Sequence, residues 1–230
     1  MASTQHSFFS TPHVLIKVCG LTTPDDARAV AVAGADWIGL NFHPPSPRFV
    51  DQATAAAILA VLPPTTEAVG LFVDRPPGEV AEVAERLGLR IVQLHGHEPP
   101  EDLLALRHLF LVRAFRLRDE ASIAVMGDYL RRAEALGRMP DAVLVDAYVA
   151  GLPGGTGRTI TDRVLDHLPP LPRLILAGGL SPENVAERVA RVRPWMVDAA
   201  GGVESTPGRK DPARVAAFIR AARGASRQHD

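Results

Sequence analysis

Two residues with reactive side chains stand at the ends of short apolar runs. Cys19 follows the run VLIKV (14–18) and precedes a glycine and a predicted helix start, and Asp146 stands near the end of the run AVLVDA (142–147). A helix N-terminus favours the thiolate form of a nearby cysteine, although a lone cysteine is otherwise a small buried apolar residue. A carboxylate is costly to bury unpaired, so Asp146 either meets a structural partner or belongs to a reactive site.

Two further polar side chains follow apolar runs. Arg48 ends the segment HPPSPR and could bind a carboxylate or phosphate through its guanidinium fork, although most loop arginines are only solvated. His95 in VQLHG could act as an acid, a base or an orienting group. His97 has no acidic or histidine partner at a suitable spacing, so we expect no metal site.

Two glycine-rich segments are candidates for binding phosphate. They are AGGL (177–180), which contains Gly178 and Gly179, and AAGGVES (199–205), which contains Gly201 and Gly202. Glycine lets backbone N–H groups approach an anion, and a following helix adds its dipole. The alternative is a pair of tight turns without a ligand. A third segment, GGTGR (154–158), resembles a phosphate loop in composition, but a mobile loop over the site explains it equally well.

Strands must position these residues, and eight apolar or β-branched runs are spaced along the chain. Each run is almost continuously apolar, as expected for parallel strands that are covered on both faces. Because the carboxyl ends of parallel strands share one edge, the side chains above should meet there. The predicted strands are 14–18, 37–42, 68–73, 90–95, 109–115, 142–147, 173–177 and 195–200.

Helix start signals lie between the runs, with Thr23, Ser181 and Asp211 each followed by proline. Alternating strands and helices fit a closed barrel or an open dinucleotide-binding sheet. An open sheet would carry its glycine-rich turn after the first strand, but CGLTTP has a single glycine, and the rich turns follow strands seven and eight. That position is the usual phosphate site of barrels, so we predict an α/β fold, a single-domain (β/α)8 TIM barrel.

Length and charge fit one enzyme domain. The 230 residues carry a formal charge of −1, which offers no basic field for nucleic acid, and a single cysteine, which excludes an internal disulfide. We expect residues 1–13 to be a flexible extension and 14–230 to be the catalytic barrel. The extension has no Lys or Arg, which a secretory signal peptide would carry at its start. No apolar run in the sequence approaches the length of a membrane-spanning helix. We therefore predict a cytoplasmic protein without a membrane partner.

Taken in order, several motifs resemble the phosphoribosylanthranilate isomerase family of tryptophan biosynthesis, from residue 15 to about 220. They are KVCGLTTPDDA, GADWIGLNFHPPSPR, VQLHG, LVDA with GGTGR, LAGGLSPENV and VDAAGGVESTPGRKD. The resemblance implies an Amadori rearrangement of N-(5-phosphoribosyl)anthranilate to 1-(2-carboxyphenylamino)-1-deoxyribulose 5-phosphate. It implies a small phosphorylated substrate, no cofactor and no metal.

The resemblance also implies residue roles. Asp146 would be the general acid that protonates the ribose ring oxygen, and Cys19 the general base that removes the C2 proton. These roles call for an aspartate that is held protonated and a thiol whose pKa is lowered towards neutrality. Arg48 would bind the anthranilate carboxylate. The remaining substrate-binding residues are His95 and, around the phosphate, Gly178, Gly179, Asp198, Ala200, Gly201 and Gly202.

Two segments depart from the family pattern. In the loop after the eighth predicted strand, the family commonly has Val-Ser-Ser-Gly, whereas this chain has Ala199-Ala200-Gly201-Gly202. Backbone N–H groups would then replace hydroxyl contacts to the phosphate. After GGTG, the family commonly has Lys-Thr-Phe-Asp-Trp, whereas this chain has Arg158-Thr159-Ile160-Thr161-Asp162.

Two alternatives to this function stay open. They are another phosphosugar isomerase of the ribulose-phosphate-binding barrel group, or a non-catalytic barrel that binds phosphorylated ligands. A pentulose-phosphate epimerase would need metal ligands, and the related histidine-pathway isomerase has aspartate in place of Cys19. Either a monomer or a homodimer is compatible with the sequence.

Overall fold

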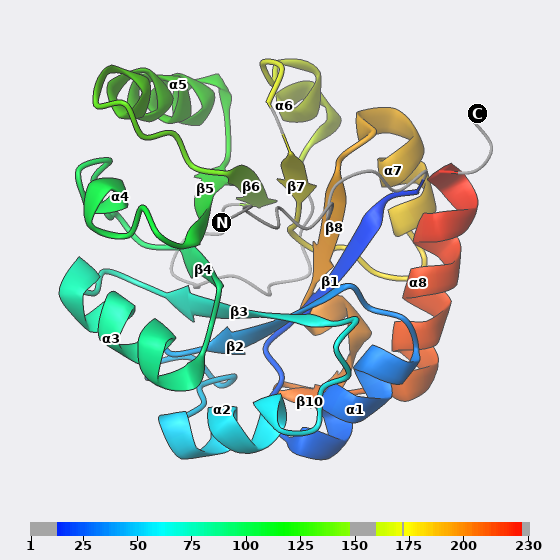
Figure 1. The fold of residues 1–230 in the computed structure, drawn as a ribbon. Helices are drawn as coiled ribbons and strands as arrows, with labels where there is room; N and C mark the ends of the chain where they lie inside the picture. The colour runs from blue at the N-terminus through cyan, green and yellow to red at the C-terminus, as the bar shows by residue number, and fades with distance from the viewer. Residues whose placement is uncertain (1–12, 148–159, 172, 227–230) are drawn as a thin grey trace, which may run out of the picture.

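A ring of parallel strands forms the centre of the molecule in this computed structural model. The structure describes residues 13–147, 160–171 and 173–226. Within these residues, eight strands close into a barrel in the order β1 to β8, with helices outside the ring (Figure 1). The predicted (β/α)8 barrel is therefore confirmed. The predicted extension, apart from His13, and the segment GGTGR lie outside the described residues.

The strands lie within about two residues of the predicted ranges. Continuous apolar runs are a sound signal here, because both faces of each strand are covered, one by the barrel interior and one by helices. β1 pairs in parallel with β2 on one side and with β8 on the other, which closes the ring. The strands are β1 (Leu15–Cys19), β2 (Trp37–Asn41), β3 (Glu67–Phe72), β4 (Ile91–Leu94), β5 (Phe110–Leu117), β6 (Ala142–Ala147), β7 (Leu174–Leu176) and β8 (Met196–Ala199).

Side chains alternate between the barrel interior and the outer layer. One buried cluster fills the interior and includes Leu15, Val69, Val112 and Ile175. A larger cluster lies between the strands and the helices and includes Phe218 of the last helix. The same alternation points Cys19, two residues after Lys17 and four after Leu15, into the ring at its carboxyl end.

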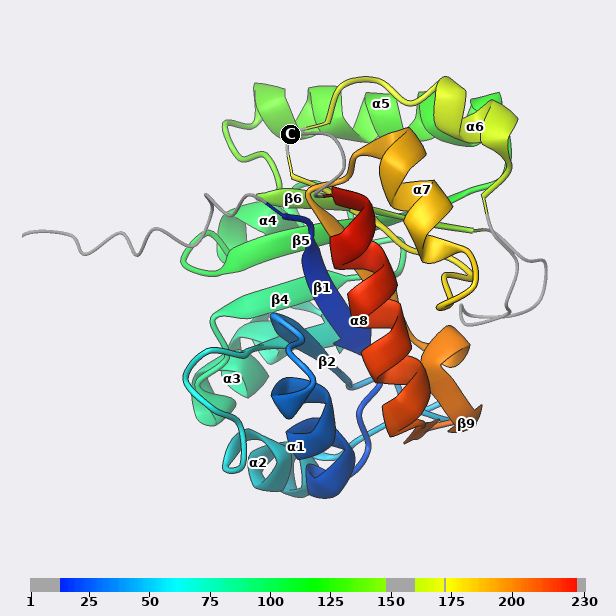
Figure 2. The ribbon, with the colours of Figure 1, turned by 90° about the vertical axis from the view of Figure 1, so that its right-hand side faces the viewer.

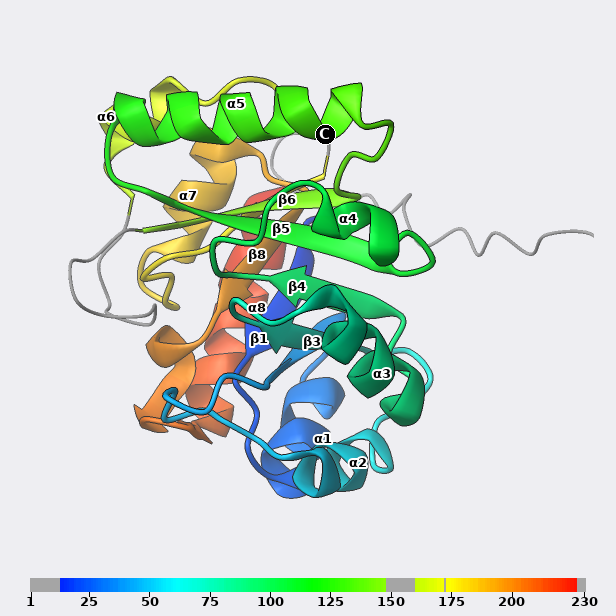
Figure 3. The same ribbon diagram turned by 90° about the vertical axis from the view of Figure 1, so that its left-hand side faces the viewer.

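Helices cover the outside of the barrel, as the two side views show (Figures 2 and 3). Two predicted starts are confirmed: the Thr23 side chain accepts from the backbone N–H of Asp26, and the Asp211 side chain accepts from those of Ala213 and Arg214. The helices are α1 (Pro24–Val32), α2 (Gln52–Leu59), α3 (Pro77–Leu87), α4 (Asp102–Ala105), α5 (Glu120–Ala135), α6 (Asp162–Asp166), α7 (Val185–Val192) and α8 (Pro212–Ser226).

The predicted helix start at Ser181 is wrong by three residues. α7 begins at Val185, because the Ser181 carbonyl accepts from Asn184 and Val185 and the Asn184 side chain accepts from the Ser181 N–H. These bonds form a turn before the helix. The helix that was expected to follow Gly178 and Gly179 therefore begins further along the chain, at Val185.

The chain after β8 forms two small elements that the sequence did not predict. A 3-10 turn (Gly201–Val203) is followed by a short antiparallel hairpin of β9 (Glu204–Thr206) and β10 (Arg209–Lys210). The hairpin places Glu204 and Lys210 beside the end of β1. Among the described residues, no helix has the length and apolar character needed to cross a membrane.

Candidate active site

One pocket opens at the carboxyl ends of the barrel strands. All ten residues that the sequence singled out line it, although they come from six separate stretches of the chain. Asn41, Leu71, Val73, Gln93 and Arg116 also line it. The ten are Cys19, Arg48, His95, Asp146, Gly178, Gly179, Asp198, Ala200, Gly201 and Gly202.

Cys19 ends β1 and is 8% exposed. Its position depends on Gly39 of β2, where an added Cβ would lie 2.5 Å from the Cys19 sulfur. Burial raises the pKa of the Cys19 thiol, and the charges of Lys17 and Lys210 oppose this rise. The expected lowering of the thiol pKa is therefore not found, because the loss of water around the thiolate outweighs the two ammonium groups.

A buried ion pair lies next to Cys19 in the barrel interior. Lys17 Nζ is 2.7 Å from Asp198 Oδ2, and both residues are buried. Although burial alone would lower it, the Asp198 carboxylate raises the pKa of Lys17. The other oxygen of Asp198, Oδ1, is buried without a hydrogen-bond partner among the described residues. Asp198 thus offers one unused acceptor atom to the pocket.

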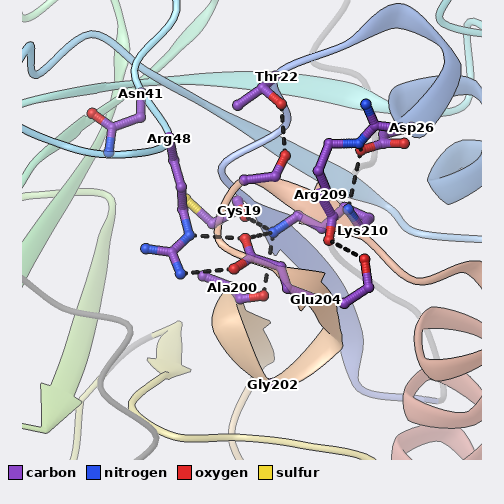
Figure 4. A network of polar contacts seen from close by, with 12 residues as sticks. Cys19, Thr22, Asp26, Asn41, Arg48, Ala200, Gly202, Glu204, Arg209 and Lys210 are labelled. Atoms are coloured by element: carbon purple, nitrogen blue, oxygen red, sulfur yellow. Dashed lines mark hydrogen bonds and ion pairs between the residues drawn. The ribbon is translucent and has the colours of Figure 1, made fainter.

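A second cluster joins Arg48 to the hairpin after β8 (Figure 4). The Nε and Nη2 atoms of Arg48 donate to the two carboxylate oxygens of Glu204, each at 2.8 Å. Lys210 Nζ donates to the same carboxylate at 2.7 Å and to the carbonyl of Cys19 at 2.7 Å. Its third bond, of 3.2 Å, goes to the carbonyl of Ala200. Lys210 therefore links the end of β1 to the loop after β8.

The electrostatics of this cluster follow from its burial. Burial would raise the pKa of Glu204, but Arg48 and Lys210 hold it below its usual value. Burial lowers the pKa of Lys210, and Glu204 opposes that change. With two cations and one carboxylate, the cluster has a net positive charge beside Cys19.

Asp146 and His95 form the opposite side of the pocket. His95 Nε2 is 3.6 Å from Asp146 Oδ2, and Nδ1 of the same ring is 2.8 Å from Gln93 Nε2. Gly178, with φ +86°, allows this packing, because an added Cβ would lie 2.4 Å from the Ala147 nitrogen and 2.9 Å from Asp146 Oδ1. Asp146 is therefore held close to a histidine and to the loop after β7.

The two glycine-rich loops touch each other. A Cβ added to Gly202 would lie 1.9 Å from the carbonyl oxygen of Leu180, so the loop after β8 packs directly on the loop after β7. The side chain of Arg214 also donates to the Gly202 carbonyl at 3.1 Å. This contact juxtaposes the backbone of Gly178–Gly179 with that of Gly201–Gly202 at one side of the pocket. In the part of the chain that the structure describes, no three His, Cys, Asp or Glu side chains are grouped to hold a metal ion.

Comparison with known proteins agrees with this geometry. The family model for N-(5'-phosphoribosyl)anthranilate (PRA) isomerase matches residues 16–221, which include every candidate residue above. The chain belongs to this family.

Two kinds of relative within the PRA isomerase family are informative. The N-(5'-phosphoribosyl)anthranilate isomerase of Geobacter sulfurreducens is 46% identical over 211 residues, 92% of this chain and 99% of the relative. A structure of monomers generated from the dimeric Thermotoga maritima enzyme has a TM-score of 0.77 and 31% identity, covering 92% and 99% of the two chains. A PRA isomerase in complex with reduced 1-(o-carboxyphenylamino)-1-deoxyribulose 5-phosphate has a TM-score of 0.76 and 32% identity, with the same coverage.

Besides the further lining residues, two charged residues beside the PRA isomerase pocket were not predicted from the sequence. Glu204 and Lys210 lie in the quoted motif VDAAGGVESTPGRKD, but their partners Arg48 and Cys19 are 156 and 191 positions away. A buried carboxylate with two cations needs three-dimensional proximity to be recognised. The signal available in the sequence was the presence of Glu and Lys in a segment that otherwise has turn character.

Proposed function

We propose that this chain catalyses the Amadori rearrangement of N-(5-phosphoribosyl)anthranilate to 1-(2-carboxyphenylamino)-1-deoxyribulose 5-phosphate in tryptophan biosynthesis. The observation that carries the proposal is that Cys19 and Asp146 line one pocket together with two adjoining glycine-rich loops. Membership of the PRA isomerase family supports the same reaction.

Asp146 is the general acid in this proposal. It gives a proton to the ribose ring oxygen as the bond from that oxygen to C1 breaks, and the nitrogen lone pair of anthranilate forms the protonated Schiff base. His95, at 3.6 Å, and the packed glycine at 178 fix the position of its carboxyl group. A carboxyl group that is 7% exposed is held in one place for this transfer.

Cys19 is the general base. Its thiolate removes the C2 proton, the electrons of the C–H bond form the C1=C2 double bond, and the positive nitrogen takes up the displaced pair. The resulting enolamine then tautomerises to the ketone, with a proton added at C1. Lys17 and Lys210 favour the thiolate against the effect of burial. The thiolate is the minor form at neutral pH, so proton removal should become faster as pH rises.

The glycine-rich loops hold the substrate phosphate through backbone N–H groups, with Gly178, Gly179, Ala200, Gly201 and Gly202 as the proposed contacts. Asp198 belongs to the binding set in a different way from the prediction. A carboxylate repels phosphate, so the free Oδ1 of Asp198 is better suited to accept from a sugar hydroxyl.

Arg48 remains the proposed contact for the substrate carboxylate through its Nη1, because Nε and Nη2 already donate to Glu204. A cytoplasmic location and a monomeric or homodimeric state remain part of this proposal. A non-catalytic phosphate-binding barrel is the second candidate, and turnover separates the two.

Growth complementation tests the proposed function. A bacterial strain that lacks its own PRA isomerase, and therefore requires tryptophan, is supplied with this chain or with its Cys19→Ala variant. We expect the wild-type chain to restore growth without tryptophan, and the variant to fail although equal amounts of folded protein are present. Growth with both would contradict the role of Cys19, and growth with neither would contradict the reaction.

A further inference from the structure

Arg116 is a pocket residue that the proposed mechanism does not use. It lies near the end of β5, two residues after Ala114 and four after Val112, which both point into the barrel interior. The same alternation points Arg116 into the mouth, where it lines the pocket and is half-buried. Its Nη2 donates to the carbonyl of His95 at 3.3 Å, which holds the guanidinium between the ends of β4 and β5.

In the described part of the chain, Arg116 has no ion-pair partner. Among the described residues, no ion pair within 4.0 Å joins Arg116 to an Asp or Glu side chain. The sequence of residues 148–159 contains no Asp and no Glu. Arg48, which also lines the pocket, is paired with Glu204 through two hydrogen bonds. An uncompensated guanidinium inside a pocket is a site for an anionic group of the ligand.

The position of Arg116 suits the end of the substrate far from the phosphate. In the ring of eight strands, β3 and β4 lie opposite β7 and β8, whose loops are the proposed phosphate site. Leu71 at the end of β3 and Val73 just after it line the pocket and offer apolar surface to an aromatic ring. Arg116 borders that surface on the β5 side.

Arg48 reaches towards another part of the mouth. Its side chain crosses the end of β1, since a Cβ added to Gly20 would lie 2.4 Å from Arg48 Cδ. Its head group then meets Glu204 in the hairpin after β8, near Cys19 and Ala200 (Figure 4). The guanidinium of Arg48 is thus drawn towards β1 and β8.

We propose that Arg116 is a second ligand, beside Arg48, for the aromatic carboxylate of the substrate and thereby contributes to the specificity of the pocket for a carboxylated ring. This inference rests on the proposed function. The contact is a charge-assisted hydrogen bond from the free edge of the guanidinium, with Arg48 adding a donor only through Nη1. Arg116 orients the substrate and transfers no proton.

A role through Asp146 is the competing explanation, because Arg116 and Asp146 are register partners on β5 and β6. In the described structure their side chains make no ion pair within 4.0 Å, and Asp146 Oδ2 lies 3.6 Å from His95 Nε2 instead. The two roles differ in what they predict. A carboxylate contact changes the affinity for carboxylated ligands alone, whereas tuning of Asp146 changes kcat and its pH dependence.

A ligand cycle tests the proposal. Calorimetry compares the wild type with Arg116→Met, Arg116→Lys and Arg48→Met, using reduced 1-(o-carboxyphenylamino)-1-deoxyribulose 5-phosphate and its phenylamino analogue without the carboxyl group. Arg118→Met is the matched control, because it removes the same charge from a side chain that is 67% exposed and outside this pocket.

We expect Arg116→Met to weaken binding of the carboxylated ligand by about 10- to 100-fold, the usual loss for one charge-assisted contact, and to leave the analogue within about twofold. Arg116→Lys should recover part of the loss. Equal losses for both ligands, no loss, or a carboxylate-dependent loss in Arg48→Met alone would overturn the proposal. If the folded wild type binds neither ligand, the proposed function itself fails.

Discussion

Replacement of Glu204 by glutamine should destabilise the barrel strongly, although the change removes no volume. The side chain is 4% exposed and accepts three hydrogen bonds from Arg48 and Lys210. Glutamine keeps one acceptor oxygen and turns an N–H₂ group towards the other donors. The Lys210 side chain, which is 1% exposed, would then be a buried cation without a carboxylate.

The magnitude follows from that loss. Breaking a buried ion pair by removing one partner costs roughly 3–5 kcal/mol. The Arg48 side chain is partly exposed and can regain water, so the lower end of the range applies, about 3 kcal/mol. For a chain of this length, that corresponds to a fall in melting temperature of about 6–12 °C.

Urea and thermal unfolding of Glu204→Gln measure this cost. The matched control is Glu120→Gln, because Glu120 pairs with Arg163 at the surface, where water screens the ion pair and its loss should change the urea midpoint little. Since Lys210 also holds the carbonyls of Cys19 and Ala200, turnover should fall with stability. If Glu204→Gln unfolds at the same urea concentration as Glu120→Gln, the cluster does not stabilise the site, and the reasoning is refuted.

Three further predictions concern the same region. Gly202→Ala should weaken phosphate-ligand binding by about tenfold, because its Cβ would lie 1.9 Å from the Leu180 carbonyl oxygen, and unchanged binding in calorimetry would contradict the contact between the loops. Alkylation of Cys19, the single cysteine, followed by mass spectrometry, should have a higher pH midpoint in the folded chain than in the unfolded chain, since burial raises its pKa; a lower midpoint in the folded chain would refute this. The pKa of Glu204 is lower in the folded chain than in the unfolded chain, so its ionised form stabilises the fold fully only above the unfolded pKa. The difference in unfolding free energy between wild type and Glu204→Gln should therefore shrink as pH falls below about 4.5. A constant difference down to pH 3 would refute the ion pair.

The barrel was predictable because its signals are local. Parallel strands that are buried on both faces appear as continuous apolar runs, and the caps at Thr23 and Asp211 depend on neighbouring backbone groups. Ser181 shows the limit of such signals. The triplet Ser-Pro-Glu fits a helix start, but the side chain of Asn184 closes a turn there and delays the helix to Val185.

The site was predictable in its members and less so in its electrostatics. Strand-end positions brought Cys19 and Asp146 to one pocket, because parallel strands share a carboxyl edge. The direction of the Cys19 pKa depends on how completely water is excluded, which neither its neighbours in sequence nor a helix start can specify. Likewise, the pairing of Arg48 with Glu204 and the contact of Arg116 with the His95 carbonyl join segments that are distant in sequence.

The isomerisation of N-(5-phosphoribosyl)anthranilate, with Cys19 as base and Asp146 as acid, stays a prediction until turnover is measured. A fluorescence assay measures it, with anthranilate, phosphoribosyl pyrophosphate and the upstream transferase generating the unstable substrate in place. We predict that the wild type accelerates substrate consumption in proportion to its concentration, whereas Cys19→Ala and Asp146→Asn, folded to the same melting temperature within a few degrees, leave the rate near background. A folded wild type that does not change the rate, or variants that match it, would contradict the account.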